Sequence, residues 1–498
     1  MFQRIEEAIE FIDEHNLKLT ENGATAKSSA NAGSLLDLFS VAGSLRSRPQ
    51  AVTQMFEEAY AEDALLAAKL AFYTRDVREG LGEREAGRLM FRSMAKNHPD
   101  AMRKNLRMIA EFGRYDDLCE LLDTPVKEDV LRLLHEQLGK DLAAMKEGKP
   151  VSLLAKWLPS VNASSRRTVR RARRIAEAFG LNEREYRHTL SALRSYLNVT
   201  EVRMSAKEYE LIDYEAVSSN AMNRLRAAFF RNDAARYDAY LKSVQKGTKR
   251  IHAGTLFPYD IVYKYMKEMG WYMGGSRPYT RPDEVLEAQW EALPDYVDTD
   301  ENTLVMVDVS GSMSGLPMAT SIGLGIYFAE RNRGVFANRI MLFSERPILI
   351  TLYGETLAEK LNEIADLPIG YNTDLEAAFN NVLFEAVRLN VPQSQLPARI
   401  VVISDNEIDS LRYQVRWNFV DEMKHRFEEA GYTMPDLILW NVASRQNTFL
   451  ADGSSENVQF CSGQAASVFK TFINSLHMTP YEYMISVLNS PRYDCITV

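Results

Sequence analysis

The sequence predicts a multidomain chain in which an all-α region is followed by an α/β domain. Over the first 260 or so residues, apolar side chains recur at three- and four-residue spacing, which is the helical pattern. From Thr303 onward, short apolar runs alternate with turn and helix signals, the order typical of a doubly wound parallel sheet. Residues 271–300 show neither pattern and are interpreted as an irregular linker.

The helical region reads as short helices joined by brief turns, which indicates an α-solenoid of stacked helix pairs without a fixed repeat length. The clearest helical segments are residues 1–15, 51–77, 82–98, 127–148, 168–180 and 183–197. The polar, small-residue segment 19–34 is interpreted as a loop or a disordered arm. The expected domains are therefore an N-terminal helix and flexible arm (1–50), a helical domain (51–270), the linker (271–300) and the α/β domain (301–498).

In the α/β domain, four apolar runs are interpreted as buried parallel strands, and the segments between them as crossover helices. The strands are expected within 304–310, 338–344, 396–405 and 435–442, and the helices within 317–332, 356–367, 373–390 and 420–431. This order predicts an open, mostly parallel sheet covered by helices on both faces. Ligands of such a sheet bind beyond the carboxyl ends of the strands.

Composition narrows the class of protein. The 498 residues include 59 Lys and Arg against 68 Asp and Glu, a formal charge of −9, and three cysteines. A hydrophobic content of 46% excludes disordered and collagen-like chains. No apolar run reaches the roughly 18 residues of a membrane helix, and the first residues carry carboxylates where a signal peptide is apolar. The three distant cysteines favour neither a disulfide framework nor a zinc site. We therefore expect a cytoplasmic protein with no membrane partner.

The charge is unevenly distributed along the chain. Residues 301–498 contain 14 Lys and Arg against 23 Asp and Glu, whereas residues 146–260 contain 22 basic and 12 acidic side chains. A local excess of this kind is an electrostatic footprint for polyanions even on an acidic protein. The alternative is a set of solvated helix faces, the more common fate of charge runs.

The end of the first predicted strand carries the run Asp308-Val-Ser310-Gly-Ser312. Thr373, which opens a predicted helix, and Asp405, which ends another strand, are expected at the same edge of the sheet. These five oxygen donors suit Mg²⁺ or Mn²⁺ and do not suit zinc. The alternative is a Ser-rich turn that only fills a βα loop.

The segments DVSGSMSG, NTD and ISDNEID resemble the three parts of the metal-ion-dependent adhesion site of von Willebrand factor A domains. The resemblance implies that Ser310, Ser312 and Thr373 contact the ion directly and that Asp308 and Asp405 act mostly through water. It also implies an open coordination position that a carboxylate of a protein partner can fill.

Further motifs resemble the family of unknown function numbered 2828, a relative of the TROVE module of the Ro autoantigen. They are FYTRDVREGLGERE (72–85), EFGRYDDL (111–118), KWLPS (156–160), EYRHTLSALR (185–194) and KGTKRIHAGTLFPYDIV (246–262), followed by ISDNEID, LILWNV, FCSG and MTPYEYMISVL. The resemblance covers about four fifths of the chain. It implies a ring of HEAT-like helical repeats closed against a von Willebrand A domain, which binds structured or misfolded RNA.

Six arginines form the densest basic feature and are the candidate RNA-binding residues: Arg166, Arg167, Arg170, Arg171, Arg173 and Arg174. On a helix, 166, 170, 173 and 174 are expected to share one face, with 167 and 171 beside it. Arginine suits phosphates because it makes bidentate, charge-assisted hydrogen bonds. The alternative is an exposed helix whose arginines pair with acidic neighbours.

The charged segment around Arg75, Asp76, Arg78, Glu83 and Arg84 is interpreted as a buried ion-pair network and not as a catalytic set. Three functions are compatible with these sequence features. The first is a non-enzymatic RNA-binding protein with a Mg²⁺-binding domain for partner contact, and the second is a metal-dependent adaptor without RNA. The third, a hydrolase or nuclease, ranks last because the metal site is dominated by hydroxyls and no nucleophile–base pair is evident.

Overall fold

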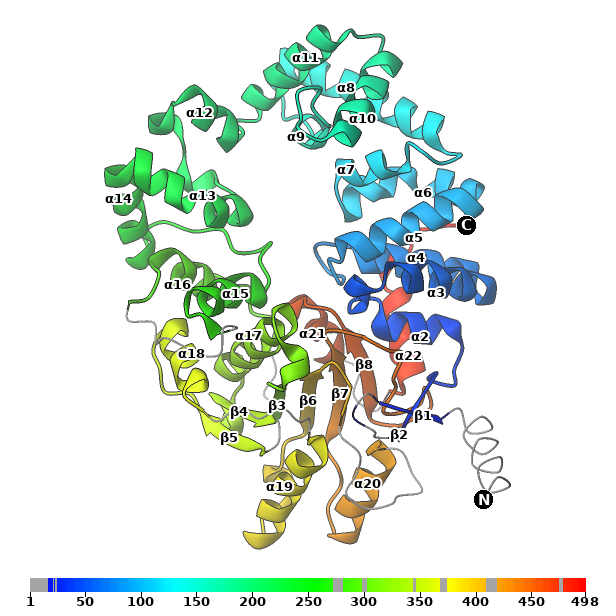
Figure 1. The fold of residues 1–498 in the computed structure, drawn as a ribbon, viewed down its shortest axis with the longest axis vertical. Helices are drawn as coiled ribbons and strands as arrows, with labels where there is room; N and C mark the ends of the chain where they lie inside the picture. The colour runs from blue at the N-terminus through cyan, green and yellow to red at the C-terminus, as the bar shows by residue number, and fades with distance from the viewer. Residues whose placement is uncertain are drawn as a thin grey trace.

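The computed structural model consists of a mostly helical region followed by a mixed α/β sheet domain (Figure 1). It describes residues 17–20, 22, 25–271, 281–297, 302–343, 346–367, 374–408, 419–473 and 478–498. In the described part of the chain, no helix has the length and apolar character needed to cross a membrane.

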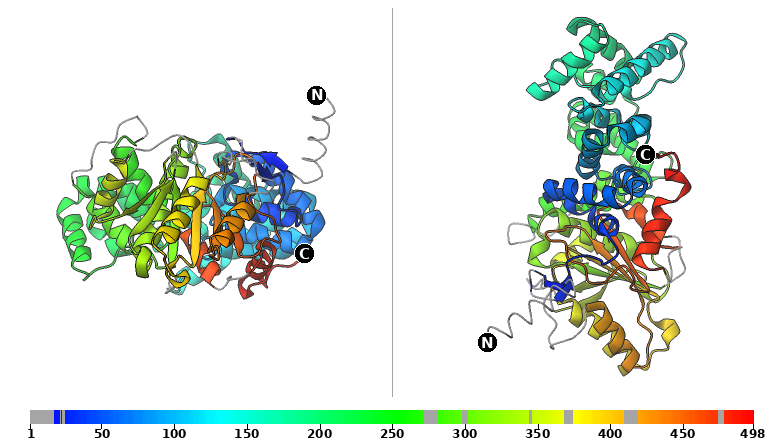
Figure 2. Two further views of the ribbon diagram at one scale, coloured as in Figure 1. Left: turned by 90° about the horizontal axis from the view of Figure 1, so that it is seen from below. Right: turned by 90° about the vertical axis from the view of Figure 1, so that its right-hand side faces the viewer.

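The helices of the first region form an arc that leaves the sheet domain at one side and returns to it at the other (Figure 1). Seen edge-on, the arc is a flat layer standing on the sheet domain (Figure 2, right). The helices are α2 (Ser34–Val41), α3 (Pro49–Glu62), α4 (Ala64–Arg75), α5 (Arg84–Asn97), α6 (Pro99–Phe112), α7 (Tyr115–Leu118), α8 (Lys127–Lys146), α9 (Leu154–Trp157), α10 (Arg166–Ala178), α11 (Glu183–Tyr196), α12 (Thr200–Ala206), α13 (Ser219–Asn232), α14 (Ala234–Gln245), α15 (Pro258–Glu268) and α16 (Glu284–Glu291).

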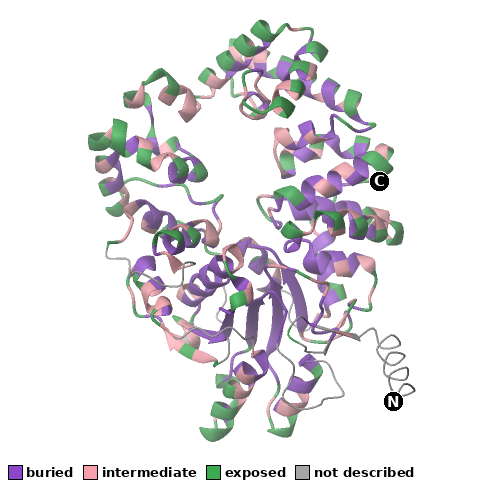
Figure 3. Cartoon of the chain, viewed as in Figure 1, coloured by how far each residue is buried: buried purple, intermediate pink, exposed green. Residues whose placement is uncertain are grey.

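The sheet of the second domain has six strands in the order β5-β4-β3-β6-β7-β8. They are β3 (Thr303–Asp308), β4 (Arg339–Phe343), β5 (Ile348–Thr351), β6 (Arg399–Ser404), β7 (Asp436–Asn441) and β8 (Val458–Ser462). All neighbouring pairs are parallel except β4 and β5. Every residue of β3, β6, β7 and β8 is buried, so both faces of these strands are covered (Figure 3). The sequence predicts buried strands at β3, β6 and β7 but not at β8.

Six helices complete the sheet domain: α17 (Leu316–Arg331), α18 (Leu357–Ala365), α19 (Leu375–Arg388), α20 (Phe419–Glu429), α21 (Phe469–Ile473) and α22 (Pro480–Leu488). Both ends of the helical arc pack on this domain. At one end α2 packs on β8 and α22, and at the other α15 packs on α17 and α16 on α18. The C-terminal residues reinforce the first junction, since Arg492 forms an ion pair with Asp76 after α4.

The structure differs from the expected helices at two points. The segment 51–77, predicted as one helix, is divided into α3 and α4 by Asp63, whose carboxylate accepts a hydrogen bond from the backbone N of Leu66 at 2.8 Å. The expected linker contains α16, which Asp283 caps in the same way and which buries Trp290. In both cases a capping aspartate starts a new helix where the apolar periodicity alone gives no boundary.

The segment 19–34, expected to be a loop or a disordered arm, contains an ordered strand. Strands β1 (Leu17–Leu19) and β2 (Thr25–Lys27) pair antiparallel. Lys27 forms a backbone bridge to Phe449 and an ion pair of 2.6 Å with Asp452. These two partners of Lys27 thus lie more than 400 residues away in the chain, where a local composition signal cannot detect them. The helix expected at 1–15 lies outside the described residues.

Candidate metal centre and basic pocket

Two neighbouring strands bring the predicted metal-site carboxylates to one edge of the sheet. Asp308 is the last residue of β3, and Asp405 directly follows β6, the parallel neighbour of β3. Both side chains are buried, with at most 1% of each residue exposed. The parallel arrangement therefore places two carboxylates beside each other, as expected for the carboxyl ends of adjacent strands.

Hydroxyl groups surround Asp308. Its Oδ1 accepts a hydrogen bond of 2.8 Å from the backbone N of Ser310, and its Oδ2 accepts one of 2.7 Å from the hydroxyl of Ser404. The hydroxyls of Ser310 and Ser312 lie 3.0 Å apart. Burial, followed by the charge of Asp405, raises the pKa of Asp308 to about 7. The cluster is thus rich in oxygen, and its two carboxylates repel each other, a repulsion that a cation would relieve.

Of the five predicted metal-site residues, the structure gathers Asp308, Ser310, Ser312 and Asp405. Thr373 lies outside the described residues. The neighbouring Asp374 caps α19 by accepting a hydrogen bond of 2.8 Å from the backbone N of Ala377.

Besides Ser404, two residues near this cluster escape the sequence analysis. Arg445, in the loop after β7, hydrogen-bonds the carbonyl of Ser312, and its Nε lies 3.9 Å from Oδ2 of Asp405. Glu407 is fully buried, and its Oε1 accepts a hydrogen bond of 3.1 Å from the hydroxyl of Thr448. Both follow the ends of parallel strands, so the strand-end rule that identifies Asp405 also applies to them.

The six candidate RNA-binding arginines all lie on α10. The helix begins after Ser165, whose hydroxyl accepts a hydrogen bond of 3.4 Å from the backbone N of Thr168. It buries Ala172, Ile175 and Ala176 and packs against α8 and α11. The arginines therefore occupy the rest of its surface, from which guanidinium groups extend into solvent or toward neighbouring turns.

Four of the six arginines pair with acidic neighbours. Arg171 binds both carboxylate oxygens of Glu120, in the turn after α7, at 2.5 and 2.8 Å. Arg167 reaches the same carboxylate at 3.1 Å. Arg174 pairs with Asp123 at 3.0 Å and Arg173 with Glu183 at 2.7 Å. The alternative interpretation, an exposed helix that pairs with acidic side chains, thus accounts for these four residues.

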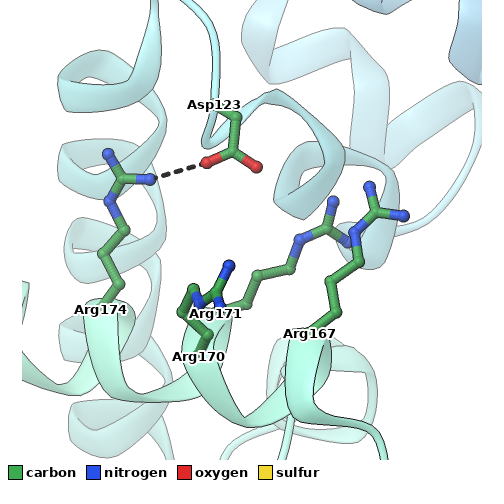
Figure 4. A pocket seen from close by; sticks show the side chains of 5 residues that line it. All are labelled: Asp123, Arg167, Arg170, Arg171 and Arg174. Carbon is green, nitrogen blue, oxygen red and sulfur yellow. Dashed lines mark hydrogen bonds and ion pairs between the residues drawn. The ribbon is translucent and has the colours of Figure 1, made fainter.

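Arg166 and Arg170 differ from the other four. Both are exposed, and neither forms an ion pair with a residue that the structure describes. Arg170 contributes to a pocket of about 310 Å³ (Figure 4). The pocket is lined by Asp123, Arg167, Arg170, Arg171 and Arg174.

The pocket uses only part of this arginine surface. Sequence spacing groups Arg166 and Arg173 with Arg170 and Arg174, whereas the pocket takes Arg167 and Arg171 in their place. The apolar side of α10 fixes its rotation against α8 and α11, and Glu120 then draws Arg167 and Arg171 toward the turn after α7. The position of that turn is a tertiary feature, which helical periodicity does not contain.

Comparison with known proteins assigns the chain to a family. The family model described as a domain of unknown function (DUF2828) matches residues 20–131 and 126–301. The chain belongs to the DUF2828 family. A second model, described as a domain of unknown function (DUF7788), matches residues 302–489 of this DUF2828 protein. The boundary between the two matches coincides with the start of the sheet domain at β3.

A viral relative is similar to this chain over nearly its whole length. The protein named "Uncharacterized protein L728" of Acanthamoeba polyphaga mimivirus is 27% identical over 513 residues, which cover 95% of this chain and 87% of the relative. The likeness therefore spans both the helical region and the sheet domain.

In this DUF2828 protein the predicted ion-pair network is buried only in part: Arg75 and Glu83 are buried in ion pairs, whereas the pairs of Arg78 and Arg84 are partly exposed. Arg75 and Arg88 donate to opposite oxygens of the buried Asp117, at 2.8 and 2.5 Å. Glu83 pairs with Arg46 at 2.8 Å. Gly113 packs directly against Asp117, where a Cβ would collide with its carboxylate. These residues hold α4, α5 and α7 together.

Proposed function

We propose that this protein binds RNA without catalysing a reaction, and that α10 is its contact surface for structured or misfolded RNA in the cytoplasm. The observation that carries the proposal is the charge of α10, whose six guanidinium groups pair with three carboxylates among the described residues, those of Glu120, Asp123 and Glu183. Arg166 and Arg170 remain exposed without an ion pair among the described residues. Phosphates are the natural partners of such guanidinium groups, because each contact releases condensed counterions.

The architecture supports the proposal. An arc of helices that begins and ends on the sheet domain is the arrangement that a TROVE-like ring requires (Figure 1). A parallel sheet with a D-x-S-x-S turn at the end of β3 is likewise what a von Willebrand A domain requires. Both likenesses, to a TROVE-like ring and to a von Willebrand A domain, are part of the proposal.

We also propose that the oxygen cluster at Asp308 binds Mg²⁺ or Mn²⁺. The donor set fits such an ion, because buried carboxylates and hydroxyls are hard oxygen ligands and two carboxylates compensate its charge. Asp308, Ser310, Ser312 and Asp405 would hold the ion together with Thr373. The bound ion would offer a coordination position to a carboxylate of a protein partner.

The RNA proposal is tested by filter binding of a hairpin RNA at several salt concentrations. Arg170→Glu should lower the affinity about tenfold and reduce the slope of log K against log salt by about 1 or more, because a phosphate contact is lost and a repulsion is added. The matched control is Arg187→Glu on α11, where Arg187 is also exposed and forms no ion pair with a described residue. Absent or salt-insensitive binding by the wild type would refute the proposal, as would equal losses in the two variants.

A second function, a metal-dependent protein adaptor without RNA, is favoured by the four arginines that already bind carboxylates. Such a surface also suits an acidic protein. A pull-down that depends on Mg²⁺, survives ribonuclease treatment and is lost in Asp308→Ala would support the adaptor. Recovery of the same partners in EDTA would contradict it.

A further inference from the structure

The pocket on α10 gathers guanidinium groups around one space instead of spreading them along a line. Arg167, Arg170, Arg171 and Arg174 line it from α10, and Asp123, which pairs with Arg174, lines it from the opposite side (Figure 4). Asp123 is the only acidic residue among the five that line the pocket. A pocket of this kind suits a compact anion, whereas a continuous nucleic-acid backbone suits an extended groove.

The charges around the pocket leave an excess of about two. Four arginines line it, and the two carboxylates in contact with them are Asp123, paired with Arg174, and Glu120, paired with Arg167 and Arg171. Burial opposes ionisation of Glu120, but hydrogen bonding to Arg171 and the nearby positive charges outweigh it and lower the pKa of Glu120 to about 2. Glu120 is therefore fully charged near neutral pH and is already included in this balance.

Glu120 has a further arginine partner outside the pocket. Arg92 also contacts Glu120, at 3.0 Å, so this carboxylate is shared among three guanidinium groups at 3.1 Å or less. Its capacity as an acceptor is thus already divided among several donors. Arg170, which lines the pocket, has no acidic partner among the described residues and is free to bind an added anion.

We propose that this pocket binds the terminal phosphate monoester of an RNA strand, an inference that rests on the proposed RNA-binding function. A phosphate monoester carries about −1.5 to −2 charges at pH 7 and three acceptor oxygens, which matches the excess of two positive charges. An internal phosphodiester carries one charge and has two free oxygens. Arg170 supplies the main new contact, while Arg167, Arg171 and Arg174, held by Glu120 and Asp123, form a pre-arranged wall of donors.

The inference is tested with one hairpin RNA that has a short single-stranded tail and is prepared with hydroxyl ends, with a 5′-phosphate or with a 3′-phosphate. Affinities of the full-length protein are measured by fluorescence anisotropy at a single salt concentration. Wild type should bind one of the phosphorylated forms about tenfold more tightly than the hydroxyl form, the effect of charge-assisted hydrogen bonds. In Arg170→Gln this ratio should fall to about one. In the control Arg187→Gln the ratio should stay as in wild type.

The outcomes distinguish the terminal-phosphate inference from the broader RNA-binding proposal. If wild type binds all three RNAs equally, the terminal-phosphate inference is overturned while the RNA-binding proposal stands. If the preference persists in Arg170→Gln, another site reads the phosphate, and the inference is likewise overturned. If none of the RNAs binds, both proposals fail. Competition by inorganic phosphate against the phosphorylated RNA alone would support the pocket, whereas equal competition against the hydroxyl form would contradict it.

Discussion

The buried carboxylate of Asp117 should be the most sensitive single position of the helical region. Its side chain is 0% exposed and accepts hydrogen bonds from Arg75, Arg88 and the backbone N of Arg114. The side chains of Arg75 and Arg88 are themselves only 1% and 8% exposed. The change Asp117→Asn keeps the shape of the residue but leaves Arg75 buried beside a neutral amide, whereas Arg88 keeps its ion pair of 2.8 Å with Asp116.

Removing one partner of a buried ion pair costs about 3 kcal/mol or more, because the remaining charge stays buried without compensation. Since 1.36 kcal/mol corresponds to a factor of ten, local protection should fall by roughly a hundredfold. Hydrogen exchange followed by mass spectrometry measures this in the intact chain, and the loss should centre on α4, α5 and α7, which the network connects.

The matched control is Glu111→Gln. Glu111 pairs with Arg78 in the same part of the fold, but the two side chains are 61% and 55% exposed. An exposed pair contributes less than about 1 kcal/mol, so protection in this variant should change by less than about fivefold. If Asp117→Asn exchanges no faster than Glu111→Gln, the reasoning from burial is wrong for this network.

Three further predictions concern the two candidate sites. Millimolar Mg²⁺ should raise the thermal unfolding temperature of wild type, reversibly with EDTA, and should have no such effect on Ser312→Ala; equal shifts in both proteins would argue against the metal site. Glu120→Gln should strengthen binding of hairpin RNA a few-fold, because it releases Arg167 and Arg171, and weaker binding by a folded variant would contradict the RNA surface. Because the pKa of Glu120 is lowered from 4.5 to about 2, its stabilising contribution is complete above pH 4.5 and is lost as the pH falls toward 2. The urea midpoints of wild type and Glu120→Gln should therefore converge over that range. If the difference between the two midpoints does not change with pH, Glu120 does not have the lowered pKa.

Local sequence patterns were sufficient to predict much of the sheet domain. The strands β3, β4, β6 and β7 follow from short apolar runs, since a strand buried on both faces has no polar alternation. The strands β5 and β8 escape this rule. The edge strand β5 is half exposed, and β8 carries Gln459 and Ser462 among its apolar residues. Their assignment depends on which strand lies beside them.

More of the candidate metal centre than of the basic pocket could be predicted from the sequence. Asp308 and Asp405 could be brought together from sequence because the carboxyl ends of parallel strands meet at one edge. Arg445 and Glu407 follow strand ends too, but their contacts with Ser312 and Thr448 depend on how the loops fold back. For the pocket, the sequence identifies the arginines of α10 but not the residues that they face.

The sequence by itself therefore determined the two-part architecture, the helices that carry the charges and the strand ends that carry the oxygen ligands. These follow from periodicity and capping, which depend on residues within a few positions of each other. Only the tertiary structure decided which charges are neutralised. Arg171 meets Glu120 across 51 residues and Arg492 meets Asp76 across 416. Such pairs form because packed helices bring distant residues together, and on α10 they leave Arg166 and Arg170 without an ion pair to a described residue.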